Sequence, residues 1–284
     1  MAKWGKKILF ASKMTMDELN KNKPLEKLAP DFIRNTIKAV TFDIDGVIVP
    51  TGTFLRESVD GTELNVRTHK LSREMIEMIK ELKKYVWINF SSGRALLYLE
   101  HMLEDILWDK VSLIAENGNF ILFDGKIEQL VLYEQSYFQK ITDIRNDIKK
   151  LKEGKPDSVY GFEPKHVIIT VHAATKMSEI EEIVKKHDRE NELYCLWTNE
   201  GYDIGHKKTN KRTALEYLAG KLKIKPEEML TTGNNLNDKE MLDFGIGISV
   251  DPEQVSGEYA IPKKKGVLGG EILAKYLLKA MARP

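Results

Sequence analysis

The chain has 284 residues, which is enough for one large domain or for a core with an inserted module. Its 44 lysines and arginines and 43 aspartates and glutamates leave a net charge of +1, so the overall charge favours neither nucleic acid nor a membrane surface as a partner. The only cysteine, Cys195, cannot form an internal disulfide, and the sequence has no Cys/His cluster that would indicate zinc.

The N-terminal segment, residues 1–24, is basic, but its apolar run from Ile8 to Ala11 is too short for the core of a signal peptide. No stretch of the chain approaches the roughly 20 apolar residues that span a bilayer. We therefore expect a soluble, cytoplasmic protein with no membrane or nucleic-acid partner. The oligomeric state is left open.

Strand and helix patterns alternate in the first half of the chain. Residues 37–49 predict a strand, a turn and a second strand, and residues 71–85 predict a helix capped by Ser72 with Met75, Ile79 and Leu82 on one face. Strand patterns at 86–94 and 111–118 lie on either side of a helix expected from Ala95 to Leu107. This alternation is typical of a parallel sheet covered by helices.

The pattern changes after about Gly125. We expect a strand at 127–134, an amphipathic helix from Tyr137 to Leu151 that stops at Gly154, a strand at 166–173, a helix at 177–187 and a hairpin over 193–204. These elements form a module of roughly 80 residues, the size of an insertion. From Lys211 the first pattern resumes, with a helix and then strand patterns at 227–235 and 245–250.

Polar residues follow the ends of the expected parallel strands. Asp43 and Asp45 follow the first strand, Ser92 follows the second, and residues 233–238 follow a later one, while Lys211 begins a helix. Because ligands bind at the carboxyl ends of parallel strands, these groups are expected to meet in one crevice. Two carboxylates, a hydroxyl and a lysine suit phosphoryl transfer. Taken singly, each has a simpler interpretation: a solvated acidic turn, a helix cap or a surface lysine.

In this order, the segments resemble the motifs of the haloacid dehalogenase superfamily of phosphatases, in particular its Cof-like, sugar-phosphatase branch with a large α/β cap. "FDIDGVI" looks like the first motif, "INFSSGR" is similar to the second, and "IAENGNFI" resembles the ENG turn of this branch. "IGHKKTNKRTAL" resembles the third motif, with Arg212 in the place of its glycine, and "TTGNNLNDKEML" the fourth.

The resemblance implies a fold of the α/β class, in which a Rossmann-like parallel-sheet core carries an inserted α/β cap domain. We accordingly expect an N-terminal extension at 1–36, the first part of the core at 37–126, the cap at 127–205 and the second part of the core at 206–284.

The same resemblance implies roles for individual residues. Asp43 would attack phosphorus to form an aspartyl-phosphate, and Asp45 would protonate the leaving oxygen and later activate water. Lys211 would brace Asp43, and Ser92 would hold the phosphoryl group together with the neighbouring residues Gly46, Gly93 and Arg94. The implied cofactor is Mg²⁺, held by Asp43, Asp45, Asn234, Asn237 and Asp238.

The fourth motif departs from the family pattern at Asn234, where the family has aspartate. An amide oxygen can still bind Mg²⁺, but one negative charge is missing from the site. Weaker metal binding or a shifted metal optimum is therefore expected. A catalytically weak phosphosugar-binding or regulatory protein is an alternative.

Within the expected cap, Glu163, Lys165 and His172 have a spacing that resembles a short pattern in the cap of trehalose-6-phosphate phosphatases, although Ala173 and Ala174 replace the tyrosine and arginine of that pattern. Lys165 and His172 lie an odd number of residues apart, so they could converge only across a bend. Solvated or structural roles for these residues are an equal alternative, and His206 and Lys207 are equally plausible substrate contacts.

The expected activity is Mg²⁺-dependent hydrolysis of a small phosphorylated metabolite, a sugar phosphate, and a phosphomutase or phosphotransferase would use the same site. The short lysine run at 262–266 is interpreted as a solvated loop.

Overall fold

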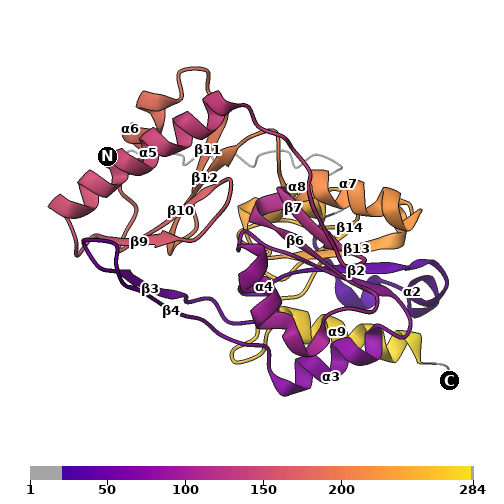
Figure 1. Ribbon diagram of the computed structural model, residues 1–284. Coiled ribbons are helices and arrows are strands. Elements are labelled where there is room, and N and C mark those ends of the chain that lie inside the picture. The colour runs from indigo at the N-terminus through magenta and orange to yellow at the C-terminus, as the bar shows by residue number, and fades with distance from the viewer. Residues whose placement is uncertain (1–20, 283–284) are drawn as a thin grey trace, which may run out of the picture.

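The computed structural model describes residues 21–282 and contains two main β-sheets with a separate two-stranded ribbon. The larger sheet has nine strands in the order β1-β15-β14-β13-β2-β5-β6-β7-β8, and the smaller, antiparallel sheet has the order β11-β12-β10-β9. Figure 1 shows the two sheets in separate bodies, with the ribbon β3–β4 running from one to the other.

The core sheet is parallel except at one edge, where β7 and β8 are antiparallel. Its strands are β1 (Lys23–Pro24), β2 (Ala39–Asp43), β5 (Trp87–Ser91), β6 (Val111–Ala115), β7 (Phe120–Phe123), β8 (Lys126–Gln129), β13 (Met229–Gly233), β14 (Ile246–Ser249) and β15 (Tyr259–Ala260). The chain leaves β2 toward β5 on one side and returns at β13 on the other. This reversal of strand order opens a crevice at the carboxyl end of β2, the usual ligand position in such sheets.

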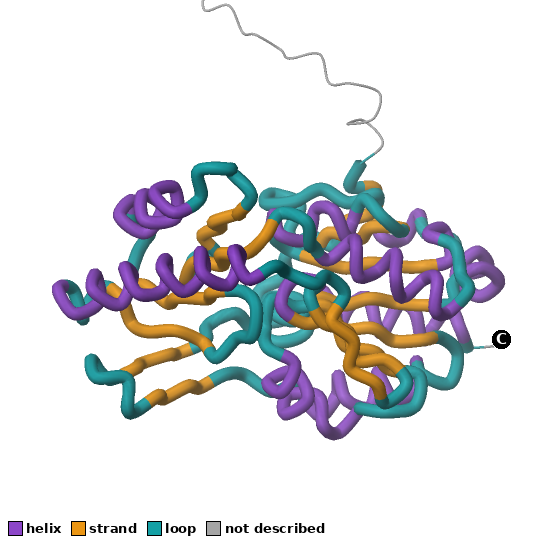
Figure 2. Tube along the Cα trace, turned by 45° about the horizontal axis from the view of Figure 1, so that its top comes forward, coloured by secondary structure: helices purple, strands orange, loops and turns teal. Residues whose placement is uncertain are grey.

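Helices cover both faces of the core sheet, which explains why β2 and β13 are buried along their whole length. One apolar cluster joins the sheet to α2 (Pro30–Thr36), α3 (Arg73–Leu82), α4 (Leu96–Leu103) and α9 (Gly269–Met281), and another joins it to α7 (Lys211–Leu222) and α8 (Lys239–Leu242). Figure 2, turned from the first view, shows the helices lying along the strands of the sheet. Short 3₁₀ turns complete the core: η1 (Leu25–Lys27), η2 (Glu104–Ile106), η3 (Glu116–Gly118), η4 (Pro226–Glu228) and η5 (Leu236–Asp238).

Local signals placed several elements correctly. The Ser72 hydroxyl accepts a hydrogen bond from the Met75 amide at the start of α3, as expected of an N-cap, and Met75 and Ile79 are fully buried. The second strand expected within 37–49 is wrong, because the chain turns at Gly46 (φ +78°) and residues 45 and 49 form only an isolated bridge. The helix expected to reach Leu107 ends at Leu103 and continues as the 3₁₀ turn η2.

The second body consists of the smaller sheet and two helices, α5 (Gln135–Gly154) and α6 (Ser178–His187). Its strands are β9 (Val159–Glu163), β10 (Ile169–Ala173), β11 (Leu193–Trp197) and β12 (Gly201–His206). Apolar side chains alternate along these strands, and one face packs on α5 and α6 through Phe162, Val171, Tyr202 and Ile204. The other face is therefore left for polar residues.

The boundaries of this body differ slightly from the expected segment 127–205. Residues 127–129 pair with β7 in the core sheet, so the strand expected at 127–134 is short and belongs to the core. Residues 23–36 of the expected N-terminal extension are also part of the core, because β1 pairs with β15 and α2 packs on α9. Residues 1–20 lie outside the described part of the chain.

The ribbon of β3 (Phe54–Glu57) and β4 (Leu64–Arg67) connects the two bodies. It leaves the core directly after β2 and packs on β9 of the smaller sheet, as Figure 1 shows. The Lys152 ammonium of α5 donates to the Glu57 carboxylate at 2.7 Å and to the Ser58 carbonyl at 2.8 Å. Among the described residues, no helix is long and apolar enough to cross a membrane.

Candidate active site

Asp43 lies at the carboxyl end of β2, level with Ser91 of β5 in the parallel register. The Lys211 ammonium, at the first residue of α7, donates to Asp43 Oδ1 at 2.6 Å and to Asp238 Oδ1 at 2.5 Å. Lys211 is 1% exposed, so its charge is compensated almost entirely by these two carboxylates. The side chains of Asp43, Lys211 and Asp238, which are far apart in the sequence, therefore form one buried ion-pair group.

The ionisation of this group reflects its burial. Burial and the neighbouring carboxylate of Asp238 raise the pKa of Asp43 to about 7, against the opposing effect of Lys211. Burial alone would lower the pKa of Lys211, but the charges of Asp238 and Asp43 raise it above its ordinary value. Asp43 thus lies in a site with excess negative charge, which a cation would relieve.

Asp45 contacts a guanidinium with both of its carboxylate oxygens. Arg94 donates from Nε to Asp45 Oδ2 at 2.8 Å and from Nη2 to Asp45 Oδ1 at 2.6 Å, and the same Nη2 donates to the Thr53 hydroxyl at 2.7 Å. Arg94 Nη1 is buried with no hydrogen-bond partner among the described residues, and Arg94 lines the cavity. A buried N–H group without a partner is expected to bind a ligand oxygen or water.

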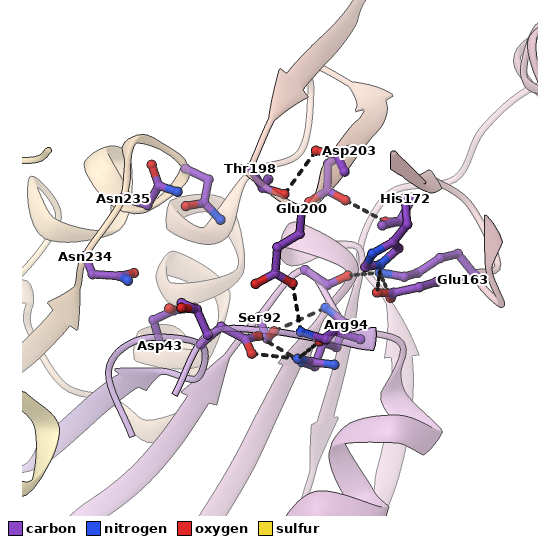
Figure 3. Close-up of a pocket in the computed structure, with 18 residues that line it drawn as sticks. Asp43, Ser92, Arg94, Glu163, His172, Thr198, Glu200, Asp203, Asn234 and Asn235 are labelled. Atoms are coloured by element: carbon purple, nitrogen blue, oxygen red, sulfur yellow. Dashed lines mark hydrogen bonds and ion pairs between the residues drawn. The ribbon is translucent and has the colours of Figure 1, made fainter. Parts of the chain in front are cut away.

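Ser92 and Gly93 form the wall of the cavity next to Asp43. The Ser92 hydroxyl accepts from the Arg94 amide at 3.2 Å and does not cap α4, whose N-cap is Ala95. The structural alternative for Ser92, a cap of the following helix, is therefore not what the structure shows. Figure 3 shows Asp43, Ser92 and Arg94 along the floor of the cavity, below the side chains of the cap.

The fourth-motif loop contributes amides to the cavity wall and a carboxylate behind it. Asn234, Asn235 and Asn237 line the cavity. Asp238 does not, because its Oδ1 accepts from Lys211 and its Oδ2 accepts from the backbone amides of Asn234 and Asn235 at 2.9 and 3.1 Å. With both oxygens engaged and no exposed surface, Asp238 holds the loop and the lysine; the metal contact expected of it has no support in this geometry.

The remaining residues nevertheless fit a hard divalent cation. Asp43, Asp45, Asn234 and Asn237 offer carboxylate and amide oxygens to one cavity, the donor type that Mg²⁺ prefers. A separate acidic cluster, Asp188, Glu190 and Glu192, lies on the second body. The Lys140 ammonium donates to all three of its carboxylates at 3.0–3.1 Å, so that cluster already holds a cation of its own.

The polar face of the smaller sheet forms the opposite wall of the cavity. The register pairs Thr170 with Glu163 on one side and with Asp203 on the other, so these three side chains share a face with His172, two residues along β10. Thr170 donates to Asp203 Oδ1 at 2.5 Å, and the His172 ring lies 2.8 Å from Glu163 Oε1. All four side chains line the cavity.

Lys165 reaches the same wall because β9 ends at Glu163 and the chain bends after it. Its ammonium lies 3.0 Å from Glu163 Oε2 and donates to the Gly93 carbonyl at 2.6 Å, so it joins the cap to the core. Burial would raise the pKa of Glu163, but the charge of Lys165 and the hydrogen bond with His172 hold that pKa well below its usual range. The structure thus brings Glu163, Lys165 and His172 together across a bend.

Several residues of the cavity were not predicted. Thr51 and Thr53 come from the loop after β2, and Thr198, Glu200 and Asp203 come from the hairpin β11–β12. Glu200 points from the hairpin into the cavity, as Figure 3 shows, and its carboxylate accepts from the Thr53 amide at 3.0 Å. Asp203 has a sequence signal, a polar residue between the apolar Tyr202 and Ile204, whereas no local pattern identifies Glu200 or the threonines.

Three residues considered from the sequence lie elsewhere. His206 is buried, with its ring Nδ1 accepting from the Lys208 amide, and Lys207 donates to Asn191; neither lines the cavity. Gly46 lines a neighbouring cavity rather than this one.

Comparison with known proteins finds one family match over part of the chain. A family model described as haloacid dehalogenase-like hydrolase matches residues 128–251. No curated protein matches the sequence of the chain significantly. The expected resemblance to haloacid dehalogenase-like hydrolases is thus confirmed over residues 128–251, and the match agrees with the expected enzyme class, a hydrolase.

Solved structures of phosphatases share the fold. The C-terminal domain of C. albicans trehalose-6-phosphate phosphatase is 17% identical, with a TM-score of 0.65 over 92% of this chain and 96% of that one. Trehalose-6-phosphate phosphatase of Aspergillus fumigatus is 16% identical, with a TM-score of 0.57 over 90% and 99%. BT1666 of Bacteroides thetaiotaomicron, a phosphatase of the HAD superfamily, is 17% identical, with a TM-score of 0.59 over 86% and 95%. The α/β class, with a core and a separate cap sheet, is therefore confirmed.

Proposed function

We propose that the chain is a Mg²⁺-dependent phosphomonoester hydrolase that acts on a small phosphorylated metabolite, a sugar phosphate, through an aspartyl-phosphate on Asp43. The observation that carries this proposal is the meeting of Asp43, Asp45 and the fourth-motif amides in one cavity covered by a polar wall. The buried Lys211 donates to Asp43 from behind this cavity. The single free cysteine, Cys195, fits a cytoplasmic location.

Asp43 is the nucleophile of this proposal. One of its oxygens accepts from Lys211, and the carboxylate lines the cavity. Attack on phosphorus forms a bond from the carboxylate oxygen and breaks the bond to the ester oxygen, which takes a proton from Asp45. Asp45 then removes a proton from the water that hydrolyses the acyl phosphate. Because both Asp45 oxygens accept from Arg94 here, at least one of these hydrogen bonds has to break before Asp45 can act.

Mg²⁺ would be held by Asp43, Asp45, Asn234 and Asn237, and when bound it supplies charge neutralisation for the phosphoryl oxygens. Lys211 adds a fixed positive charge on the Asp43 side. Ser92 and the free N–H of Arg94 are placed to donate to phosphoryl or sugar oxygens.

The cap wall supports a polyhydroxylated substrate. Glu163, His172, Thr170 and Asp203 present carboxylates, an imidazole and a hydroxyl from one sheet face. Their remaining hydrogen-bonding capacity suits the hydroxyl groups of a sugar better than an apolar substrate. Two proteins of similar structure are trehalose-6-phosphate phosphatases, whose substrate is a sugar phosphate, and this similarity favours the same substrate class without naming the sugar.

Phosphate release from 4-nitrophenyl phosphate during a Mg²⁺ titration tests the hydrolase. We expect release that saturates with Mg²⁺ and falls by at least about 10³-fold in Asp43→Asn, whereas Asp105→Asn, an exposed aspartate in η2, keeps it. Absence of Asp43-dependent release at every Mg²⁺ concentration would overturn the hydrolase and leave the phosphosugar-binding alternative that Asn234 motivates. A panel of sugar phosphates, with free sugars added as acceptors, separates hydrolysis from transfer to a second hydroxyl.

A further inference from the structure

A second cavity opens beside the candidate active site. Its volume is about 530 Å³, against about 120 Å³ for the catalytic cavity. Thr51, Thr198, Glu200, Asn234 and Asn235 line both cavities, so the two are continuous. A substrate whose phosphoryl group lies at Asp43 and that is too large for the catalytic cavity would extend into the larger space.

The two cavities differ in charge. Five carboxylates line the catalytic cavity, those of Asp43, Asp45, Glu163, Glu200 and Asp203, against two cations, Arg94 and Lys165. The second cavity is lined by three lysines, residues 263–265, and two carboxylates, those of Glu200 and Asp251. A ligand that occupies both cavities therefore has one end in an acidic environment and the other end in a basic one.

Two of these lysines are free to bind an anion. Lys263 pairs with Asp251 Oδ2 at 2.5 Å, whereas Lys264 and Lys265 have no ion-pair partner within residues 21–282. All three are exposed at the cavity wall. Glu200 lines both cavities and accepts a hydrogen bond from the amide of Thr53, which lines only the catalytic cavity. Lys264 and Lys265 are thus uncompensated charges that line the second cavity and not the catalytic one.

The lysine loop has a defined backbone. Lys264 and Val267 form an antiparallel bridge, with the Val267 amide donating to the Lys264 carbonyl at 3.1 Å, and Gly266 has a φ of +76° that closes the turn. The loop lies between β15 and α9, both of which pack in the core. The backbone at Lys264 is thus held in a turn by this hydrogen bond, which reduces the ordering that binding requires.

We propose that Lys264 and Lys265 form a second anion subsite, which binds a phosphoryl or carboxylate group at the end of the substrate remote from Asp43. This inference rests on the proposed function, and it narrows the substrate class to phosphoesters that carry a second anionic group. A free oxyanion such as inorganic phosphate has the same chemistry as an anionic group on the substrate. The experiment therefore distinguishes these two sources of the bound anion.

Paired substrates test the subsite in the full chain. We compare kcat/KM for fructose 6-phosphate and fructose 1,6-bisphosphate in the wild type, in Lys264→Ala/Lys265→Ala, and in the control Lys126→Ala/Lys149→Ala. The control removes the same charge from exposed lysines that line neither cavity. We expect the lysine-loop variant to lose about fivefold to twentyfold on the bisphosphate alone, and less at high ionic strength. Equal losses on both substrates, or the same loss in the control, would overturn the subsite.

Binding to Asp43→Asn makes the test independent of turnover. In this background, calorimetric titration with the two sugar phosphates and with inorganic phosphate reports affinity even if the chain hydrolyses nothing, so failure of the proposed function is distinguishable. Tighter binding of the bisphosphate that depends on Lys264 and Lys265 supports the substrate as the source of the anion. Lysine-dependent binding of inorganic phosphate, with equal affinities for the two sugars, supports a free-anion site. If none of the three affinities depends on these lysines, the subsite is wrong.

Discussion

At the scale of single residues, the charges around Asp43 determine whether its carboxylate is ionised and can act as a nucleophile. Lys211 compensates Asp43 and Asp238 together, so one cation faces two carboxylates, and Asp45 lies nearby with its own partner in Arg94. Burial, together with the nearby carboxylate of Asp238, raises the pKa of Asp43 to about 7. A cation bound among Asp43, Asp45 and Asn234 would favour the ionised, nucleophilic form of Asp43.

The Asn234→Asp substitution tests whether the missing negative charge limits metal binding. Asn234 lies on the cavity wall, and its amide lies against Gly46, so the near-isosteric aspartate fits the same space. We expect the Mg²⁺ concentration that gives half-maximal activity to fall about tenfold, because a carboxylate binds Mg²⁺ more strongly than an amide. A Mg²⁺ titration of phosphate release measures it. As a control, Asn146→Asp adds the same charge on the exposed side of α5 and should leave the Mg²⁺ requirement unchanged. If Asn234→Asp also leaves it unchanged, the missing charge at residue 234 does not limit metal binding.

At the scale of elements, the ribbon β3–β4 and the smaller sheet depend on a close backbone approach at Gly161. A Cβ added at Gly161 would lie 2.4 Å from Glu57 Cβ, and its φ of +143° is one that residues with a side chain rarely adopt. This contact brings Glu57 to Lys152, an ion pair whose side chains are 18% and 5% exposed. Packing of the ribbon on the cap therefore requires a residue without a side chain at this position.

Gly161→Ala is accordingly expected to destabilise the protein by about 2–4 kcal/mol, since it combines backbone strain with overpacking. Gly154→Ala is the matched control: nothing lies within 4 Å of its added Cβ, and the residue ends α5, so stability should be unchanged or rise by up to about 1 kcal/mol. Urea unfolding of both variants measures the difference. Equal stabilities would show that the ribbon does not depend on Gly161.

The loop between α6 and β11 depends on a buried carboxylate. Asp188 accepts from the Leu193 and Glu192 amides at 2.8 and 3.1 Å and pairs with Lys140. Burial would raise the pKa of Asp188, but these partners lower it below the ordinary 3.8. A lowered folded-state pKa means that the unfolded chain binds the proton more readily, so the contribution to stability is present above about pH 3.8 and is lost as the pH falls through the folded-state value.

Asp188→Asn should therefore cost about 1–3 kcal/mol of unfolding free energy at pH 7, with a smaller difference from the wild type below pH 4. Urea unfolding followed by circular dichroism between pH 7 and pH 3 provides the measurement. Asp157→Asn, an exposed aspartate of the same body, serves as the reference and should show little loss at any pH. A loss in Asp188→Asn that does not change with pH would mean that the charge of Asp188 is not what stabilises the loop.

For the whole molecule, local sequence signals predicted the core site better than the cap wall. Asp43 is the last residue of β2 and Lys211 is the first residue of α7, so their positions follow from the order of the elements. Glu200 and Thr53 meet only because a hairpin of the cap reaches a loop of the core, a contact that no local pattern encodes. Asp238 was predicted to lie at the right edge but with the wrong partners, since backbone amides and Lys211 compete for its oxygens.

The ENG turn of the core, residues 116–118, is one of the segments that join the core to the cap. Glu116 is fully buried and accepts from the His166 amide at 2.9 Å and the Val167 amide at 3.0 Å, while Asn117 donates to Asp203 at 3.2 Å. Both Glu116 and Asn117 have positive φ, 49° and 54°, a conformation that non-glycine residues hold only when their surroundings enforce it. The turn thus fixes the cap loop that carries Lys165, the residue that reaches the Gly93 carbonyl.

Glu116→Gln tests whether this docking serves substrate binding. The amide nitrogen cannot accept a hydrogen bond, so one backbone N–H of the cap loop loses its partner, and Lys165 is expected to be held less firmly. We expect kcat/KM for a sugar phosphate to fall about tenfold, chiefly through KM, with a smaller change for 4-nitrophenyl phosphate, which offers the cap wall no hydroxyls. Glu153→Gln on the exposed side of α5 removes the same charge away from the interface and should match the wild type. Equal losses on both substrates would instead assign Glu116 to the stability of the core, because a damaged core impairs every substrate alike.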